Sequence, residues 1–178
     1  MAKILIYKNA VKETGNPSFS ALYPRRNLIS IIFERLFDLV LVLACVIPVA
    51  LIVGFIYLLY RIYNKGQGSF IYSGSRLGQD KIPFDMYKIR TLMEPAEDQF
   101  AGDILTPGTG LELRFGKFLR ATRLDELPQV FNILKGEMRF IGPRPVRPSI
   151  YQKNCNMIHN YDFRFVVKPG LFGYSQIL

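Results

Sequence analysis

Two adjacent carboxylates, Asp125 and Glu126, lie within the stretch Gly116–Pro148, which combines many charges with three closely spaced prolines. Apolar residues at helical spacing follow Asp125, and Gly136 supplies a stop signal, so the pattern predicts a helix with Asp125 as its N-cap. The first turn of a helix offers unpaired N–H groups and a partial positive charge, which hold a carboxylate ionised. An ionised carboxylate there can be a nucleophile. The alternative is a capping aspartate on an ordinary basic surface helix. The apolar residues are Leu127, Val130, Phe131 and Leu134.

Arginines flank the two carboxylates on both sides in the sequence. Arg120 and Arg123 precede them, and Arg144 and Arg147 follow the predicted helix. A guanidinium group presents N–H donors in a fork that suits bidentate contact with phosphate oxygens. The pattern therefore favours a phosphate-containing ligand near Asp125. We interpret Arg123 as a solvated surface residue and give Arg147 little weight.

The balance of charge and hydrophobicity is unusual for a soluble protein, because a net charge of +9 accompanies 49% hydrophobic residues. Such a balance favours an anionic partner, which can be nucleic acid, an acidic membrane surface or a phosphorylated substrate. The uncharged run Leu39–Tyr60 decides for the membrane. At about 1.5 Å per residue, a straight helix of this length just spans a hydrocarbon core of roughly 30 Å. The run is too long for a signal peptide, and no small-residue cleavage site follows it.

Pro48 lies near the middle of this run, where it removes a helical hydrogen bond and divides the run into two arms. Basic residues flank both ends of the run, which favours both ends remaining on the cytoplasmic side. The sequence therefore predicts a re-entrant helix that enters the bilayer, breaks at Pro48 and returns to the same face. The alternative is a proline-kinked helix that spans the membrane. The flanking basic residues are Arg25, Arg26 and Arg35 on one side and Arg61, Lys65, Arg76 and Lys81 on the other.

A strand-like pattern extends from Phe70 to Met93, with a turn around Gly78-Gln79-Asp80, and predicts a β-hairpin. Lys88 and Arg90 are two residues apart, so both point the same way, into water or toward an anionic ligand. Glu94–Gly110 has the composition of a loop that covers a site or decorates the surface.

Further along the chain, Ile150–Asn160 is predicted to be helical and Phe163–Val167 to be a strand. The expected fold class is α+β, mostly helical, in a monotopic membrane protein. Three parts are predicted: an N-terminal arm at 1–26, the re-entrant membrane helix at 27–62 and a small cytosolic catalytic domain with the hairpin at 63–178.

The sequence gives no indication of a disulfide, of a metal site built from Cys and His, or of a glycine-rich nucleotide-binding loop. Cys45 lies in the apolar run and Cys155 in a polar segment, so we expect both to be reduced. The sequence has one histidine, His159, and no Cys or His spacing typical of a metal site. It also lacks the glycine patterns of nucleotide-binding loops.

Several short motifs resemble those of the bacterial sugar transferases, the monotopic phosphoglycosyl transferases of cell-surface glycan assembly. The resemblance covers roughly Phe33 to Gln176, and the motifs follow in the same order. They are Arg35-Leu36-Phe37-Asp38, Lys88-Ile89-Arg90-Thr91, Leu124-Asp125-Glu126-Leu127-Pro128-Gln129, Gly142-Pro143-Arg144-Pro145 and Lys168-Pro169-Gly170. The sequence departs from the family at Ile47, which precedes Pro48 where the family typically has serine, and at Ile89, which replaces an aromatic residue. Family members commonly continue past the segment like Gly173-Tyr174-Ser175-Gln176, so the sequence is either a short variant or a truncated one.

The resemblance implies a transferase that moves a sugar-1-phosphate from a UDP-sugar to polyprenol (undecaprenyl) phosphate and releases UMP. The first membrane step of surface glycan assembly, such as exopolysaccharide or lipopolysaccharide, is the implied setting. The enzyme would act at the cytoplasmic face of the bacterial inner membrane, with no nucleic-acid partner. Its re-entrant helix would hold the site at the level of the lipid substrate.

The resemblance also implies roles for individual residues. Asp125 would attack phosphorus to form an aspartyl-phosphate intermediate, and Glu126, together with Asp125, would hold Mg2+. Arg120 would bind the transferred phosphate. Arg144, stiffened by Pro143 and Pro145, would contact the nucleotide or its phosphates. Lys88 and Arg90 would belong to the substrate-binding surface.

Two other classes of protein are compatible with parts of the sequence. A glycoside hydrolase needs two carboxylates that face each other across a sugar at about 5 to 9 Å, which adjacent residues do not naturally provide. A membrane-anchored module that binds anions without catalysis needs only the apolar anchor and the positive charge. Release of UMP distinguishes this module from the transferase.

Overall fold

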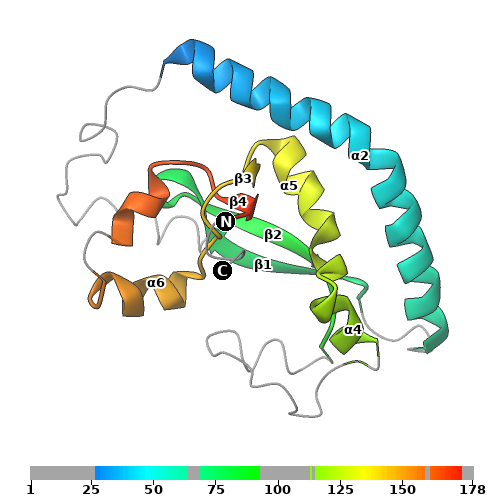
Figure 1. Cartoon of the computed structure of the whole chain (residues 1–178). Helices are drawn as coiled ribbons and strands as arrows, with labels where there is room; N and C mark the ends of the chain where they lie inside the picture. Colours follow the sequence, from blue (N-terminus) through cyan, green and yellow to red (C-terminus); the bar gives the residue numbers. More distant parts are fainter. Residues whose placement is uncertain (1–26, 64–68, 93–112, 114, 159–160, 174–178) are drawn as a thin grey trace. The chain divides into compact units, whose positions relative to one another are not determined.

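The computed structural model describes residues 27–63, 69–92, 113, 115–158 and 161–173. Within these ranges the chain is mostly helical with two small sheets, which confirms the α+β class (Figure 1). The predicted N-terminal arm and the predicted loop Glu94–Gly110 lie outside the described residues. The elements are α2 Leu28–Tyr63, β1 Ile71–Leu77, η2 Gln79–Lys81, β2 Pro83–Ile89, α4 Gly116–Ala121, η3 Leu124–Gln129, α5 Val130–Lys135, β3 Arg139–Ile141, α6 Pro148–Cys155, η4 Tyr161–Phe165 and β4 Gly170–Phe172.

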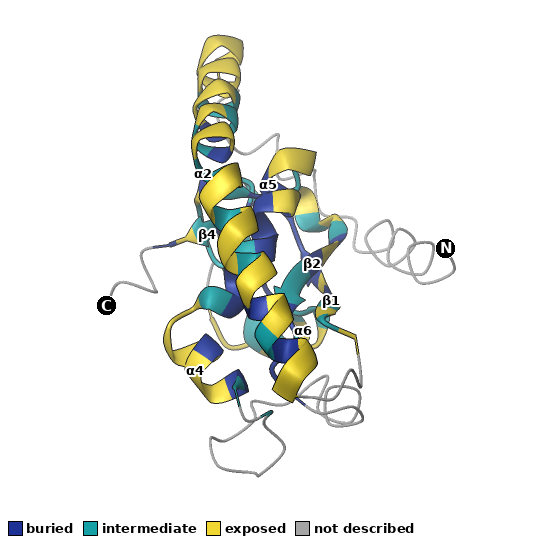
Figure 2. Cartoon of the chain, turned by 90° about the vertical axis from the view of Figure 1, so that its right-hand side faces the viewer, coloured by how far each residue is buried: buried dark blue, intermediate teal, exposed yellow. Residues whose placement is uncertain are grey.

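Helix α2 is long and apolar enough to cross a membrane, and most of its surface is exposed (Figure 2). Leu43, Ile47 and Leu51 recur at intervals of four residues on one face and are 70%, 70% and 71% exposed. The buried positions of α2 form a separate stripe at helical spacing. A water-soluble protein rarely exposes so large an apolar surface, so we interpret α2 as a membrane-associated helix. The buried positions are Asp38, Val42, Ile56 and Tyr60.

Pro48 lies inside α2 rather than between two separate helices. The ribbon of α2 changes direction near the middle of its length (Figure 1). A proline removes one N–H donor and its ring crowds the preceding turn, which bends a helix without necessarily ending it. The predicted division into two helical arms is therefore wrong in this respect, because one helix continues through the proline. The return of the chain to the same membrane face stays a prediction.

Strands β1 and β2 form the predicted hairpin. The connection between them is too short for a parallel crossover, so the pair is antiparallel. The Gly78 N–H donates to the Ile82 carbonyl oxygen at 2.9 Å and closes the turn. Asp80 and Lys81 have φ angles of 53° and 59°, in the left-handed region that non-glycine residues seldom occupy. The predicted turn position is confirmed.

A second sheet pairs β3 with β4 in parallel, with Arg139 opposite Gly170 and Ile141 opposite Phe172. The predicted strand at Phe163–Val167 is wrong, because the 3-10 helix η4 occupies most of it. Phe165 of this segment packs against α6 instead of facing one side of a sheet. The Tyr151 ring meets Phe165 edge-on at 5.4 Å, and Phe165 is buried. The predicted helix Ile150–Asn160 is confirmed only as far as Cys155, where α6 ends.

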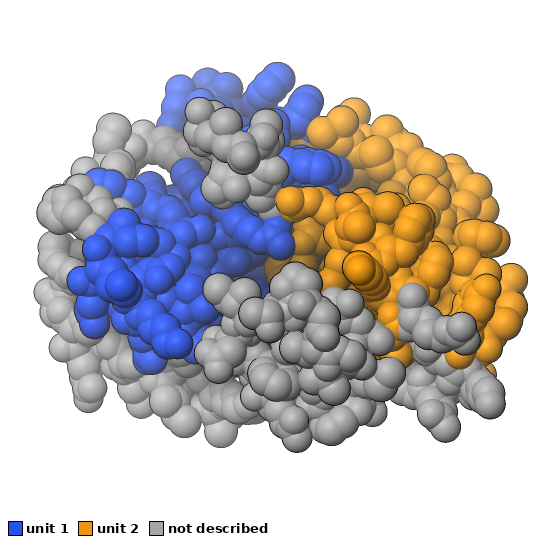
Figure 3. All heavy atoms as spheres, turned by 60° about the horizontal axis from the view of Figure 1, so that its bottom comes forward, with its two compact units in different colours: residues 1–37, 75–85, 137–178 blue, residues 38–74, 86–136 orange. Residues whose placement is uncertain are grey.

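The chain forms two compact units (Figure 3). The first comprises Met1–Phe37, Ser75–Asp85 and Glu137–Leu178, and the second comprises Asp38–Gly74 and Met86–Gly136. Within the first unit, Arg139 of β3 forms an ion pair and a hydrogen bond with Glu34 of α2.

The core of the second unit joins the end of α2 to the hairpin and to α4. Ile56, Ile89 and Leu119 are buried together, and three partly buried side chains pack against them. Burial of each such side chain contributes about 1.5–3 kcal/mol. This cluster fixes β2 and α4, the elements that carry the candidate site. The three surrounding residues are Phe70, Phe115 and Leu124.

Candidate active site

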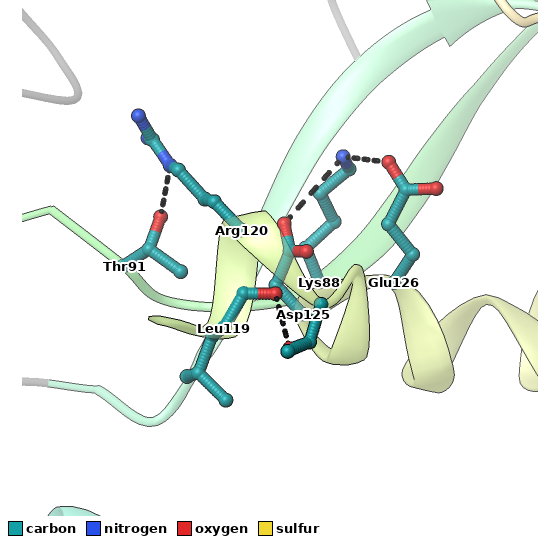
Figure 4. Close-up of polar contacts among 7 residues, drawn as sticks. Lys88, Thr91, Leu119, Arg120, Asp125 and Glu126 are labelled. Atoms are coloured by element: carbon teal, nitrogen blue, oxygen red, sulfur yellow. Dashed lines mark hydrogen bonds and ion pairs between the residues drawn. The ribbon is translucent and has the colours of Figure 1, made fainter. Parts of the chain in front are cut away.

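Asp125 and Glu126 are both buried in the second unit, each with 7% of its surface exposed, and they share one cation (Figure 4). The ammonium group of Lys88 donates a 2.7 Å hydrogen bond to Glu126 Oε1 and lies 3.8 Å from Asp125 Oδ2. Buried carboxylates need such partners, because removing a charge from water without one is costly. Strand β2 supplies the lysine, and η3 supplies both acids.

The backbone around the two acids differs from the predicted helix cap. Asp125 lies in the first turn of the 3-10 helix η3, and the residue before this helix is Arg123 in a left-handed conformation. Pro128 lies inside η3 and has no N–H to donate, so the tight helix gives way to α-helix only at Val130. The prediction that Asp125 is an N-cap is therefore wrong. The predicted stop at Gly136 is confirmed, with a φ of 80°.

Burial raises the pKa of Asp125 above its ordinary value of 3.8. The positive charge of Lys88 opposes this rise, the neighbouring Glu126 charge adds to it, and the Arg120 charge opposes it. This result differs from the expected helix terminus that would hold the carboxylate ionised. Ionisation of Asp125 depends instead on two cations from β2 and α4.

The Arg120 side chain is held by Thr91, a residue for which the sequence predicted no role. The Nε–H of Arg120 donates a 2.8 Å hydrogen bond to Thr91 Oγ1, and Thr91 is buried. Figure 4 shows Thr91, Arg120, Asp125 and Lys88 in one cluster. Thr91 follows the end of β2, where period-two alternation no longer indicates which way a side chain points. The Arg120 charge opposes the rise in the Asp125 pKa, and the predicted contact of Arg120 with a phosphate stays a prediction.

Lys88 lies against the acids, and the backbone of Arg90 extends the hairpin. Lys88 contacts both carboxylates directly. Arg90 follows β2, and its backbone N–H donates a 2.8 Å hydrogen bond to the carbonyl oxygen of Phe70, which extends the hairpin pairing by one residue. The alternation of the strand left open whether Lys88 points into water or toward an anionic group, and the structure places it against the two carboxylates.

Pro143, Arg144 and Pro145 belong to the first unit and lie, half-buried, in the segment between β3 and α6. The backbone of this segment is hydrogen-bonded to residues further along the chain: the Gly170 N–H donates to the Pro143 carbonyl at 3.0 Å. Arg147 precedes α6 as its N-cap residue in an extended conformation. In the second unit, Arg123 is exposed, which agrees with its interpretation as a solvated residue.

Among the described residues of the second unit, Asp125 and Glu126 are the acidic residues that form ion pairs with Lys88. Among the described residues, no cluster of three Asp, Glu, His or Cys side chains could hold a metal by itself. Mg2+ characteristically binds one or two carboxylates and completes its coordination with water and substrate phosphates. The oxygen donors of Asp125 and Glu126 therefore fit a magnesium ion that arrives with a phosphorylated substrate.

Comparison with known proteins gives a consistent result. The family described as "Bacterial sugar transferase" matches residues 29–178. A UDP-glucose:undecaprenyl-phosphate glucose-1-phosphate transferase from Klebsiella pneumoniae is 34% identical over 157 residues, which are 85% of this chain and 32% of the relative. A putative undecaprenyl-phosphate N-acetylgalactosaminyl 1-phosphate transferase from Bacillus subtilis is 42% identical over 98 residues, 54% of each chain.

A third relative is the UDP-N-acetylgalactosamine-undecaprenyl-phosphate N-acetylgalactosaminephosphotransferase of Aeromonas hydrophila. It is 36% identical over 117 residues, 64% of this chain and 27% of the relative. The chain thus spans about a third of the length of the Klebsiella relative, about a quarter of the Aeromonas one and about half of the Bacillus one.

Proposed function

The chain belongs to the bacterial sugar transferase family, and on that premise we propose that it transfers a sugar-1-phosphate from a UDP-sugar to undecaprenyl phosphate and releases UMP. The product is an undecaprenyl diphosphate sugar. The names of the relatives support the lipid acceptor, and they differ in the sugar. The observation that carries the proposal is the buried pair Asp125 and Glu126 around the Lys88 ammonium group.

The membrane association of α2 supports a lipid substrate. One reactant is an amphiphile of the bilayer, so the site must lie at the membrane surface, and the exposed apolar faces of α2 supply an anchor. Pro48 within this helix and the basic residues that flank it favour the re-entrant arrangement. The UDP-sugar is cytosolic, so we place the site at the cytoplasmic face of the inner membrane.

In the first chemical step, a carboxylate oxygen of Asp125 forms a bond to the phosphorus that carries the sugar. The bond from this phosphorus to the bridging oxygen breaks, and UMP leaves with that oxygen and its electron pair. The attack needs an ionised carboxylate, and the charges of Lys88 and Arg120 favour that form. Arg120, oriented by Thr91, would also contact the phosphate oxygens.

In the second step, a phosphate oxygen of undecaprenyl phosphate attacks the phosphorus of the aspartyl phosphate. The bond between phosphorus and the Asp125 oxygen breaks, and the carboxylate regains its electron pair. Lys88 then again faces two carboxylates, as it does in the structure. The lysine thus balances a local charge that changes during each turnover.

Mg2+ would be held by Glu126 and Asp125 and would neutralise phosphate charge. Arg144, between Pro143 and Pro145, would contact the nucleotide or its phosphates, since a guanidinium group suits both phosphate and aromatic partners. Arg90 would add positive charge near the end of β2.

Release of UMP from a panel of UDP-sugars, with undecaprenyl phosphate and Mg2+ present, tests the proposal. We expect release with at least one sugar and its loss, by at least about 1,000-fold, in Asp125→Asn. The matched control is Asp85→Asn, which makes the same change at an exposed position of β2. Full turnover in Asp125→Asn would exclude the covalent mechanism.

The alternative is a membrane-anchored module that binds anions without catalysis, which the +9 charge and the apolar helix would serve equally well. This alternative predicts binding to vesicles that contain acidic lipids, with no release of UMP from any UDP-sugar by the wild-type protein.

A further inference from the structure

The segment Lys168-Pro169-Gly170 lies directly against the segment that carries Arg144, and no role has so far been assigned to it. We call residues 142–147, Gly142-Pro143-Arg144-Pro145-Val146-Arg147, the arginine loop. The Arg139 N–H donates to the Pro169 carbonyl at 2.9 Å, and the Gly142 N–H donates to the Phe172 carbonyl at 3.0 Å. The parallel pair β3 and β4 therefore continues up to the start of the arginine loop.

Glycine is required on both sides of this contact. A Cβ atom on Gly142 would lie 2.6 Å from the Lys168 carbonyl oxygen and 2.8 Å from the Gly170 nitrogen. A Cβ atom on Gly170 would collide in turn with the backbone of Gly142. Both obstacles are backbone atoms, which cannot rotate away as a side chain can. The two segments are thus packed as closely as their backbones allow.

Three carbonyl oxygens of the arginine loop accept hydrogen bonds from three different parts of the first unit. The Pro143 carbonyl accepts from the Gly170 N–H at 3.0 Å, and the Val146 carbonyl accepts from the Leu77 N–H at 2.8 Å. The Arg144 carbonyl accepts from Nη2 of Arg164 at 2.8 Å. Pro143 and Pro145 fix two further φ angles. The loop backbone is therefore held on both sides of Arg144.

Arg164 is itself held in place by aromatic packing. Its guanidinium carbon lies 4.7 Å from the centroid of the Tyr161 ring, in a cation-π contact. The Tyr161 hydroxyl accepts a 3.1 Å hydrogen bond from Asn154 of α6. A planar guanidinium group can lie over a ring and still donate from its edge, which a lysine ammonium cannot do from one position.

We propose that Arg164 and Gly170 are positioning residues that hold the arginine loop in the conformation in which the Arg144 side chain receives the nucleotide sugar. The inference rests on the proposed role of Arg144. A long arginine side chain loses rotamer entropy when it binds, so a backbone that is already fixed lowers the cost of binding. Arg164 acts through the Arg144 backbone and touches no substrate.

A double-mutant cycle on UMP release tests this assignment with the variants Arg164→Ala and Arg144→Ala. We expect Arg164→Ala to raise KM for the UDP-sugar about tenfold, the value of one charge-assisted hydrogen bond, and to change kcat by less than about threefold. In the Arg144→Ala background, Arg164→Ala should raise KM no further. Independent, multiplicative effects on KM, or a loss confined to kcat, would overturn the proposal.

Two matched variants show whether an effect of Arg164→Ala comes from the position of Arg144 or from a general change in charge or folding. Lys153→Ala removes one positive charge from an exposed position of α6 and should leave KM unchanged. Arg164→Lys keeps the positive charge but loses the planar guanidinium group with its several N–H donors, so it should show a smaller rise in KM than Arg164→Ala. If Arg164→Ala does not fold, Arg164→Lys decides alone, and a wild-type KM in it counts against the proposal.

Amide hydrogen exchange of the full-length protein in lipid nanodiscs tests the same assignment without relying on activity. Arg164→Ala should accelerate exchange at the backbone amides of Gly142, Arg144, Val146 and Arg147, and Lys153→Ala should not. Unchanged exchange in Arg164→Ala would overturn the proposed clamp. If the wild-type protein releases no UMP, the proposed function fails, and the exchange measurement still decides whether Arg164 holds the loop.

Discussion

Lys88 Nζ lies 2.7 Å from Glu126 Oε1, across 38 residues of sequence, and so joins the hairpin to the acidic pair. The same ammonium group lies 3.8 Å from Asp125 Oδ2. Two neighbouring buried carboxylates repel each other, and one cation between them reduces the cost of ionising both. Lys88 therefore controls how readily Asp125 exists as the carboxylate that the proposed mechanism needs.

Replacement of Lys88 by methionine should lower kcat/KM about 10–100-fold at neutral pH, the value of one charge-assisted hydrogen bond. Loss of the Lys88 charge raises the pKa of Asp125 further, because that charge opposes the effect of burial. The acid limb of the pH–rate profile should consequently move to higher pH. Lys135→Met, which removes an exposed lysine of α5, is the control and should leave the profile in place. A Lys88→Met profile identical to that of the wild type would contradict this role.

Replacement of Asp125 by asparagine should stabilise the metal-free protein at neutral pH although it abolishes transfer. Burial raises the pKa of Asp125 in the folded state. The protonated carboxyl group therefore makes its whole contribution to the free energy of unfolding below pH 3.8, and this contribution disappears as the pH rises through the folded-state pKa. Asparagine carries no charge to bury. Thermal unfolding should give a higher Tm for Asp125→Asn at pH 7.5, and the difference should vanish below pH 3.8. A lower Tm at pH 7.5 would contradict the direction of the shift.

Removal of divalent ions with EDTA should abolish UMP release, and Mg2+ should restore it, since Asp125 and Glu126 offer the hard oxygen donors that this ion prefers. In Glu126→Gln the Mg2+ concentration for half-maximal activity should rise at least about tenfold. Glu137→Gln, outside the acidic pair, serves as the control. Equal Mg2+ dependence in Glu126→Gln and the wild type would exclude Glu126 as a ligand.

The re-entrant arrangement predicts that both ends of α2 face the cytoplasm. Single cysteines at positions 12 and 65, in a background without Cys45 and Cys155, should react with a membrane-permeant thiol reagent. Neither should react in intact cells with an impermeant reagent added from outside. External labelling of one position would show instead a helix that spans the membrane with a kink at Pro48.

The buried side chain of Asn132 links helix α5 to strand β2. Asn132 is fully buried in α5, and its Oδ1 accepts a 3.1 Å hydrogen bond from the Tyr87 N–H of β2. Asn132→Ala would leave this N–H without a partner in the core and should lower the free energy of unfolding by about 1–3 kcal/mol. Unfolding by urea in detergent micelles measures the change. The exposed Asn156→Ala should lie within about 0.5 kcal/mol of the wild type.

Local patterns in the sequence predicted the features whose causes are local. The apolar run around Pro48 predicted α2, because the length and hydrophobicity of a helix are properties of consecutive residues. The hairpin, with its turn at Gly78, followed from alternation and turn chemistry. The acidic pair and Arg120 of α4 were predicted as site residues from their types and spacing together with the resemblance to the sugar transferases.

Other predictions failed where local signals competed with packing. Asp125 resembles a helix cap in sequence, yet Pro128 keeps the following turn in a 3-10 helix. The strand pattern of Phe163–Val167 gave way to η4, because aromatic contacts with Tyr151 outweigh a pattern that no neighbouring strand supports. Whether an alternating segment becomes a strand depends on a partner elsewhere in the chain.

The sequence by itself determined the long apolar helix, the hairpin and the choice of Asp125 and Glu126 as candidate site residues, because each depends on residues within a few turns of one another. Only the tertiary structure decided that Lys88 pairs with Glu126, that Thr91 orients Arg120 and that Arg164 holds the Arg144 backbone. These contacts join residues about 20 to 40 positions apart, and they form only once burial brings separate elements together and favours hydrogen-bond partners for most buried polar groups.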